Sequence, residues 1–344
     1  MSDGSDSGRP TVSALAPLIC FISVLIVSSC TSPGEMPTLV QPIVTPSPIA
    51  NNTTAASVPT QSPVRVSTAT PTWTAEPSVT PSMTPSVTPT PGCQESGRVE
   101  QGRFPSSLAQ PDLAYRIYLP PCYGNDNHVY PVLYMLPGNI HDDSIWDQLG
   151  LDEAAESGIQ SGTLPPMLIV MPEGGSISNE TSGGPYSYEA VIVNELLPFV
   201  KSKYCAWQDA SGQAIGGLSR GGYWSLEIAF RNPDVFGSVG GHAAALIDTY
   251  AGPALDPKYT AQTSDLSAVR IYLGTGQSDW YLGPLQILHE NLLTVGKEHL
   301  WVIQEGSHNN DYWSAHVGDY LDWYAESWLI DRDLLPVCEI GLSD

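Results

Sequence analysis

The stretch "AIGGLSRGGYWSL", from Ala214 to Leu226, places one serine among four glycines. Apolar residues of strand type precede Ser219, and a helical pattern follows it. Where a strand turns sharply into a helix, the apex residue is strained, and flanking glycines remove the Cβ atoms that would collide there. The stretch therefore predicts a nucleophile elbow with the Ser219 hydroxyl above a sheet. A tight turn with an incidental serine is the alternative.

After residue 92, strand-like runs alternate with helical patterns, which is typical of a mostly parallel sheet with helices on both faces. Strands are predicted within residues 113–121, 131–138, 165–175, 213–219, 269–279 and 298–308. Helices are predicted within residues 144–158, 188–204, 219–233, 282–296 and 311–329. The fold class that follows is α/β.

A serine hydroxyl is a weak nucleophile near neutral pH, so it needs a base, and the base needs an orienting group. In α/β-hydrolases the acid and then the histidine follow the serine along the chain. Asp279 comes at the end of a predicted strand, and His308 lies in the loop directly after the last one. We therefore predict Ser219 as nucleophile, His308 as general base and Asp279 as orienting acid. A solvated turn aspartate is the alternative for Asp279.

The other histidines after the serine fit less well. His289 and His316 lie within helical patterns, and His299 begins the last strand at the wrong end of the sheet. His242 leaves no strand between itself and the serine for an acid. Asp311 is closer to the base in sequence, but it is predicted to cap the final helix.

A tetrahedral intermediate also needs backbone N–H donors. One donor comes from the residue after the nucleophile, Arg220, and the other from the loop after an early strand. In that loop Asn139 is the candidate. Because both donors are backbone groups, we expect the identity of either side chain to matter little.

The sequence of residues 1–30 is typical of an export signal. The apolar run from Ala14 to Val27 is interrupted by Pro17 and is shorter than a comfortable membrane span. "VSSC", ending at Cys30, resembles a bacterial lipobox. Residues 1–30 are therefore predicted to be a signal sequence with a lipid attached at Cys30. The lipid would hold the exported protein at the cell surface. An uncleaved membrane anchor is the alternative.

Residues 31–92 are rich in Pro, Thr and Ser and contain too few large apolar residues for a core. We predict a disordered linker there and one α/β domain over residues 93–344. The net charge of -23 disfavours nucleic-acid binding and suits solubility outside the cell. Neither a CxxC nor an HExxH spacing occurs, and no metal or cofactor is predicted.

Four cysteines remain for the domain, which in an exported chain suggests two disulfides. Three connectivities are open. We favour Cys93 with Cys122, because one opens the domain and the other ends an early strand. Cys205 then pairs with Cys338.

Several stretches together resemble the esterases of the α/β-hydrolase superfamily that include esterase D, feruloyl, acetyl-xylan and enterochelin esterases and the mycolyltransferase antigens. They are "YRIYLPPCY", "YPVLYMLPG", "MLIVMPEG", "NELLPFVKSKY", "AIGGLSRGGYWSLEIAFRNPDVFGSVGGHAAA", "YLGTGQSD" and "EGSHNNDYW". The resemblance implies the same triad and the same role for Asn139. Two positions depart from the family: Pro137 stands where many members have histidine, and Arg220 where methionine is frequent.

Four aromatic residues flank the predicted catalytic loops and are candidates for a substrate site, with a place in the core as the alternative: Trp146, Trp280, Tyr281 and Trp313. The only cap candidate, Ala243 to Ser267, is short. An open cleft for esters on larger molecules, such as acetylated or feruloylated polysaccharides, is our hypothesis. The membrane would be contacted only through the N-terminal lipid or anchor.

These features predict an exported serine esterase that needs no cofactor. An acyltransferase on the same triad, in which an alcohol replaces water, is one alternative. A non-catalytic surface binding protein is another, and peptidase activity is a third.

Overall fold

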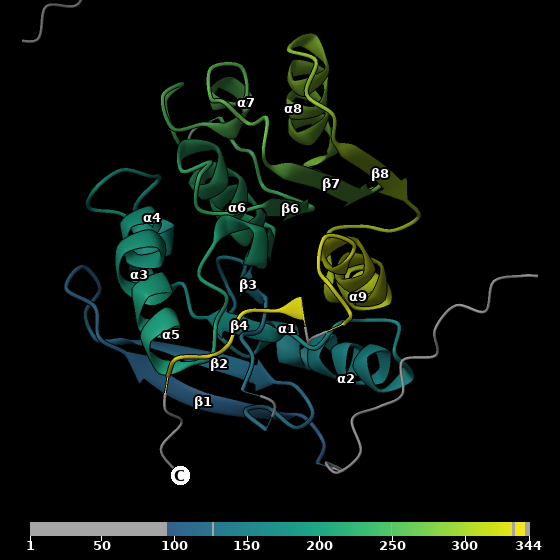
Figure 1. The fold of residues 1–344 in the computed structure, drawn as a ribbon. Helices are drawn as coiled ribbons and strands as arrows, with labels where there is room; N and C mark the ends of the chain where they lie inside the picture. The colour runs from purple at the N-terminus through teal and green to yellow at the C-terminus, as the bar shows by residue number, and fades with distance from the viewer. Residues whose placement is uncertain (1–94, 126, 249, 332–333, 341–344) are drawn as a thin grey trace, which may run out of the picture. The chain divides into compact units, whose positions relative to one another are not determined.

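The structure, a computed structural model, describes residues 95–340 except 126, 249 and 332–333 (Figure 1). The predicted signal sequence, the linker, Cys30 and Cys93 lie outside the described residues. Within the described ranges, no helix combines the length and the apolar character that crossing a bilayer requires.

In the described part of the chain, eight strands form one sheet in the order β1-β2-β4-β3-β5-β6-β7-β8. Neighbours from β4 to β8 are parallel, whereas β1 pairs with β2, and β2 with β4, in antiparallel fashion. The strands are β1 (Arg98–Phe104), β2 (Leu113–Leu119), β3 (Val132–Leu136), β4 (Leu168–Pro172), β5 (Gln213–Leu218), β6 (Ser238–His242), β7 (Arg270–Gly276) and β8 (Leu300–Gln304). The mostly parallel sheet confirms the predicted class.

Helices cover both faces of the sheet (Figure 1). One core cluster joins the sheet to α4 (Tyr188–Val191), η1 (Ile192–Leu196), α5 (Leu197–Lys203), α6 (Arg220–Arg231) and α8 (Leu282–Thr294). The other joins its opposite face to α1 (Ile145–Gln148), α2 (Leu151–Ser161) and α9 (Asn310–Ala325). Shorter pieces are α3 (Gly175–Glu180), η2 (Ala210–Gly212) and α7 (Pro257–Thr260). Of these, only α7 lies in the connection from β6 to β7, so the cap is minimal.

Three helix predictions need correction. The helix predicted over 144–158 is two helices, because Gly150 adopts a left-handed φ of 86° between them. The long helix from residue 188 contains a π-helical turn, η1, that ends two residues before Pro198, which has no N–H to donate. Asn309 caps α9 by accepting from Tyr312 N, and Asp311 lies in the first turn instead.

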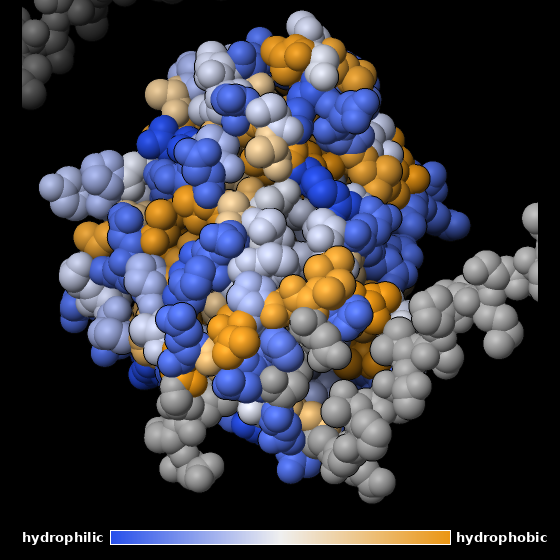
Figure 2. Space-filling view, in the orientation of Figure 1, coloured by the Kyte–Doolittle hydropathy of each residue, from blue (hydrophilic) through white to orange (hydrophobic). Residues whose placement is uncertain are grey.

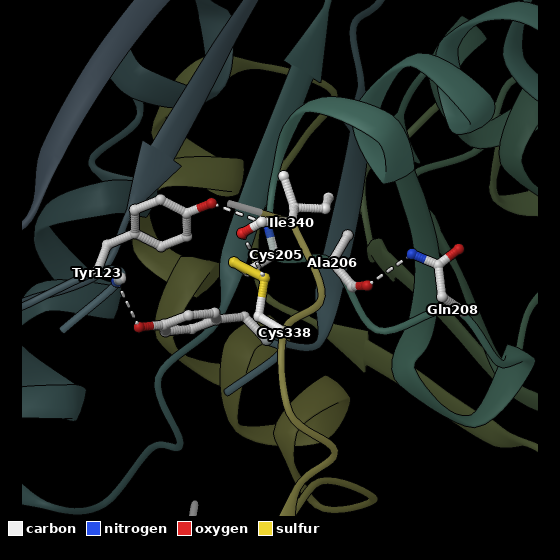
Figure 3. Close-up of a disulfide and its surroundings, with 8 residues drawn as sticks. Tyr123, Cys205, Ala206, Gln208, Cys338 and Ile340 are labelled. Atoms are coloured by element: carbon white, nitrogen blue, oxygen red, sulfur yellow. Dashed lines mark hydrogen bonds between the residues drawn. A yellow bond between two sulfur atoms is a disulfide. The ribbon is translucent and has the colours of Figure 1, made fainter. Parts of the chain in front are cut away.

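The C-terminal segment is tied to the domain by a disulfide between Cys205 and Cys338, the pairing favoured from sequence (Figure 3). The backbone adds to this attachment, because Cys338 N donates to Asn127 O and Val129 N donates to Pro336 O. Apolar side chains gather on the surface along this segment, where Leu334 and Val337 are exposed (Figure 2). A cross-link that closes a loop of 133 residues stabilises a fold by roughly 2–5 kcal/mol.

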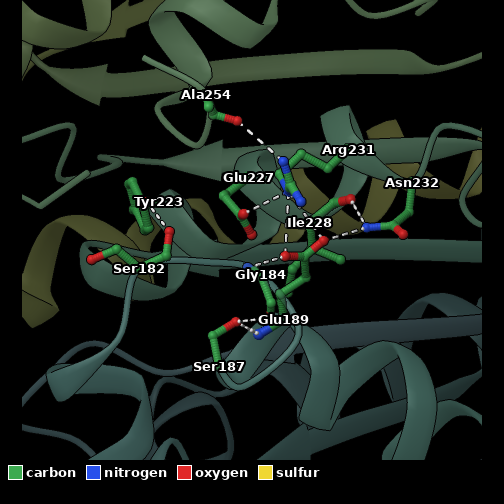
Figure 4. A network of polar contacts seen from close by, with 10 residues as sticks. All are labelled: Ser182, Gly184, Ser187, Glu189, Tyr223, Glu227, Ile228, Arg231, Asn232 and Ala254. Atoms are coloured by element: carbon green, nitrogen blue, oxygen red, sulfur yellow. Dashed lines mark hydrogen bonds and ion pairs between the residues drawn. The ribbon is translucent and has the colours of Figure 1, made fainter. Parts of the chain in front are cut away.

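A polar network joins α6 to α4 and to the loop before it (Figure 4). Arg231 Nε lies 3.2 Å from Glu189 Oε1 and 3.1 Å from Glu227 Oε1. Gly184 N donates to Glu189 at 2.5 Å. Glu227 is fully buried, and burial, with the neighbouring Glu189 carboxyl, raises its pKa to about 9.

Replacing Glu227 with glutamine is expected to raise the free energy of unfolding relative to the wild type, and this gain is expected to grow as the pH rises. The folded carboxyl keeps its proton up to about pH 9, whereas the unfolded one releases it near 4.5. Between these values the folded state binds more protons, so this group lowers the free energy of unfolding by up to about 1.4 kcal/mol per pH unit. Urea unfolding of both chains from about pH 5 to about pH 8 measures the difference. A difference that stays constant with pH contradicts the assignment.

Candidate active site

Ser219 occupies the sharp turn between β5 and α6 that the sequence predicts. Its backbone has a φ of 53° and a ψ of -117°, a left-handed φ that is strained for a residue with a side chain. Glycines make the turn possible: a Cβ on Gly217 would lie 2.4 Å from the backbone of Gly221, and one on Gly222 would lie 2.8 Å from Ala244. Gly217 and Gly222 therefore allow the backbone segments of this turn to pack closely.

His308 connects the serine to the acid. Its Nε2 lies 2.8 Å from Ser219 Oγ, and its Nδ1 lies 2.8 Å from Asp279 Oδ2. The Asp279 side chain is fully buried, and its other oxygen, Oδ1, accepts from Tyr281 N at 2.7 Å. The structure thus brings together the three residues predicted as a triad, with one imidazole between a hydroxyl and a carboxylate.

The loops after β7 and β8 bring the acid and the histidine together. These strands are parallel neighbours, so their carboxyl ends meet at the same edge of the sheet. Gln277 N donates to Gln304 O across the start of the two loops. Gly276 packs so closely on the next loop that a Cβ would lie 2.4 Å from Gly306 O, and Gly306 itself has a φ of 143°.

The loop after β3, which carries Asn139, packs directly on the start of α6. A Cβ on Gly221 would lie 2.3 Å from Leu136 O and 2.6 Å from Pro137 O. This contact brings the Asn139 loop to the turn that holds Ser219. Arg220 is the first residue of α6, so its backbone N–H has no acceptor within the helix. Both expected donors therefore belong to segments that meet beside the serine.

The Arg220 side chain contradicts the expectation that only the backbone of this residue matters. It is 3% exposed, and its guanidinium lies 3.8 Å from the centre of the Tyr250 ring. Nε donates to Ser178 O and Nη2 to Thr181 O. Burial lowers the pKa of this guanidinium. The side chain therefore fixes α3 and its following loop on α6.

Three of the four predicted aromatic residues surround His308. Their ring centres lie 5.3 Å (Trp280), 4.9 Å (Tyr281) and 4.9 Å (Trp313) from the imidazole. Trp280 is 71% exposed, so it can meet a substrate, whereas Trp313 is buried and backs the imidazole from the protein side. Trp146 takes the alternative position and not the substrate site: it lies in the core and donates to Leu136 O at 3.0 Å.

The remaining histidines have other positions. His242 is fully buried beside Tyr324 Oη, and burial lowers its pKa to about 3. His289 and His299 contact each other, and His316 bonds to Tyr312 O within α9.

Sequence reasoning missed His141, whose imidazole fills the space beside Gly138 and contacts Trp313. Burial lowers its pKa, although the neighbouring Asp142 carboxyl opposes this shift. No motif marks this residue, because its place depends on how the loop folds back.

Comparison with known proteins gives a family and a fold. The family model described as "Putative esterase" matches residues 106–326. A Mycobacterium tuberculosis protein named as an esterase is 29% identical over 148 residues, which cover 41% of this chain and 31% of the relative. An endo-1,4-beta-xylanase/feruloyl esterase of Xylanibacter ruminicola is 29% identical over 153 residues, or 41% of this chain and 21% of the relative. The chain thus spans about a third or less of these curated relatives.

Solved structures share the fold. A ferulic acid esterase superposes with a TM-score of 0.62 at 21% identity, covering 68% of this chain and all of the other. An S-formylglutathione hydrolase from Agrobacterium tumefaciens superposes with a TM-score of 0.56 at 16% identity, covering 67% of this chain and 96% of the other. The described domain therefore has the α/β-hydrolase fold.

Proposed function

Because the chain belongs to this esterase family, with a match over residues 106–326, we propose that it is a serine esterase that hydrolyses carboxylic esters. The observation that carries the proposal is the contact of one imidazole, His308, with both the Ser219 hydroxyl and the Asp279 carboxylate, each at 2.8 Å. This arrangement is the one that activates a serine for attack on a carbonyl.

In the proposed reaction, Ser219 Oγ attacks the ester carbonyl while His308 Nε2 accepts its proton. The buried Asp279 accepts from Nδ1, which fixes the tautomer and stabilises the imidazolium that forms. Backbone N–H groups of Asn139 and Arg220 stabilise the negative oxygen of the tetrahedral intermediate. His308 then returns the proton to the departing alcohol, and water releases the acid from the acyl-enzyme by the reverse sequence.

For the substrate we propose acetyl or feruloyl esters attached to carbohydrate. The exposed Trp280 beside His308 provides an aromatic surface for the acyl group, with Tyr281 next to it. The short connection between β6 and β7, which contains only α7, leaves room for a bulky alcohol. Relatives named as a feruloyl esterase and a ferulic acid esterase support this choice.

We propose that the protein acts outside the cell, attached by a lipid at Cys30 and carried on the linker of residues 31–92. The lipobox-like sequence and the Pro/Thr-rich composition support this location. The Cys205–Cys338 disulfide is consistent with it, because such bonds persist mainly in oxidising compartments.

The function is tested by incubating the purified chain with acetyl, feruloyl and longer-chain esters and measuring the released acid. Hydrolysis of at least one class, with a burst of alcohol before steady state, is expected for an acyl-enzyme route. Added glycerol separates the alternatives, because an acyltransferase forms glycerol ester in place of free acid. If the chain cleaves none of these esters, the proposal is overturned, and a binding protein or a peptidase remains as the alternative.

A further inference from the structure

We propose that the side chains of Arg220 and Asn179 form a brace that holds the two oxyanion-hole donors in register. The brace runs from α6 through α3 to the loop after β3. The inference rests on the proposed function, because it assigns these side chains a role in stabilising the same tetrahedral intermediate. Both are positioning residues, and neither side chain needs to touch the substrate.

The first part of the brace fixes α3 on the nucleophile helix. Arg220 Nε donates to Ser178 O at 3.1 Å, and Nη2 donates to Thr181 O at 2.5 Å. Trp224, one turn further along α6, donates from Nε1 to the same Ser178 carbonyl at 3.0 Å. The planar guanidinium binds two carbonyls at once, and its central carbon lies 3.8 Å from the centre of the Tyr250 ring, so three contacts define its position.

The second part reaches from α3 to the oxyanion loop. Asn179 lies between the two residues whose carbonyls Arg220 binds, and its Nδ2 donates to Asn139 O at 3.0 Å. Asn139 is therefore connected to α6 through one side chain and one short helix. Any movement of α3 relative to α6 shifts the Asn179 donor that holds this loop.

The N–H of Asn139 is fixed by the bonds on either side of it. His141 N donates to Gly138 O at 3.1 Å, and that carbonyl shares a peptide unit with the Asn139 N–H. Because a trans peptide is planar, its N–H points away from its carbonyl, and hence away from the inside of the turn. Asn179 holds the next peptide unit. Both peptide units of Asn139 are thus held, one by the turn and one by the brace.

Arg220 consequently contributes to both donors: its own N–H lies after Ser219, and its side chain positions the second donor. The oxyanion develops only in the transition state, so a loosened brace lowers kcat more than it alters substrate binding. Losing a whole donor costs about 10²- to 10³-fold in rate, so misplacing one costs a fraction of that.

The test uses Asn179→Ala, Arg220→Met and the double variant. Each single change is expected to lower kcat by roughly 5- to 20-fold, with KM within about two-fold of the wild type. The affinity for a boronic acid, which forms a tetrahedral adduct, falls by a similar factor. Because the two side chains act in series, the double variant is expected to lose little more than the worse single variant.

Two matched controls separate positioning from general destabilisation. Glu180→Gln alters the exposed neighbour of Asn179 on the same helix, and Arg231→Met removes an arginine from the other end of α6. The first is expected to keep both kcat and melting temperature. The second is expected to lower the melting temperature while keeping kcat. If Arg220→Met does not fold, the exposed Asn179→Ala decides alone.

The failure of the brace is distinguishable from the failure of the proposed function. If the wild type hydrolyses esters and Asn179→Ala keeps full kcat and full boronic acid affinity, the brace is wrong and the esterase stands. A rise in KM with unchanged kcat also overturns the brace, because it indicates a substrate contact. If the wild type itself cleaves no ester, the proposed function fails first.

Discussion

Replacing Ser219 with alanine is expected to lower kcat/KM for any ester substrate by about 10⁴- to 10⁶-fold. The change removes the attacking oxygen and leaves the rest of the site in place, including the backbone donors. The backbone φ of 53° at residue 219 is as strained for alanine as for serine, so the fold should be retained. Steady-state hydrolysis of a p-nitrophenyl acetate substrate measures the loss, and thermal unfolding confirms that the variant is folded.

Ser278→Ala is the matched control, because Ser278 is an exposed serine adjacent to Asp279. It is expected to keep the wild-type rate. Equal activity in the wild type and in Ser219→Ala would mean that the hydrolysis does not depend on this serine.

Replacing Asp279 with asparagine is expected to lower kcat by about 10⁴-fold near neutral pH. Asp279 Oδ2 accepts from His308 Nδ1 at 2.8 Å, so the proton stays on Nδ1 and Nε2 is free to accept from Ser219. The asparagine amide can donate to His308 Nδ1, which favours the tautomer that carries its proton on Nε2. A protonated Nε2 cannot accept the proton of Ser219, so His308 no longer acts as a base. The pH–rate profile of both chains, with the melting temperature, checks this.

Asp311→Asn is the control for this change, since Asp311 is exposed in the first turn of α9, close to the base in sequence. It should leave kcat unaltered. A loss of less than about ten-fold in Asp279→Asn would identify Asp279 as a turn residue with no part in orienting His308.

The three residues predicted as a triad could be placed near one another from sequence, because each is marked by a local signal that the fold preserves. Ser219 lies among glycines that the turn requires, and Asp279 and His308 both follow strands of a parallel sheet. Carboxyl ends of neighbouring parallel strands meet at one edge, so such residues converge without any need to know side-chain packing.

Strand β1, the position of Trp146 and the role of the Arg220 side chain depend on tertiary packing, which a local sequence pattern does not predict. Strand β1 has polar residues on an edge and so lacks the apolar run that marks a buried strand. Trp146 lies near the catalytic loops in sequence, but its ring points into the core, where Leu136 O satisfies its N–H. The role of the Arg220 side chain depends on α3, a six-residue helix with no amphipathic pattern.

The central claim is that Ser219 becomes a nucleophile through contact with His308, 2.8 Å away. The most direct measurement is the reaction of the folded chain with a fluorophosphonate, followed by mass spectrometry of the peptide that contains Ser219. We predict a stoichiometric adduct on the Ser219 oxygen that forms far more slowly in His308→Ala. An adduct on a different residue, or continued ester hydrolysis with Ser219 unmodified, would contradict the account.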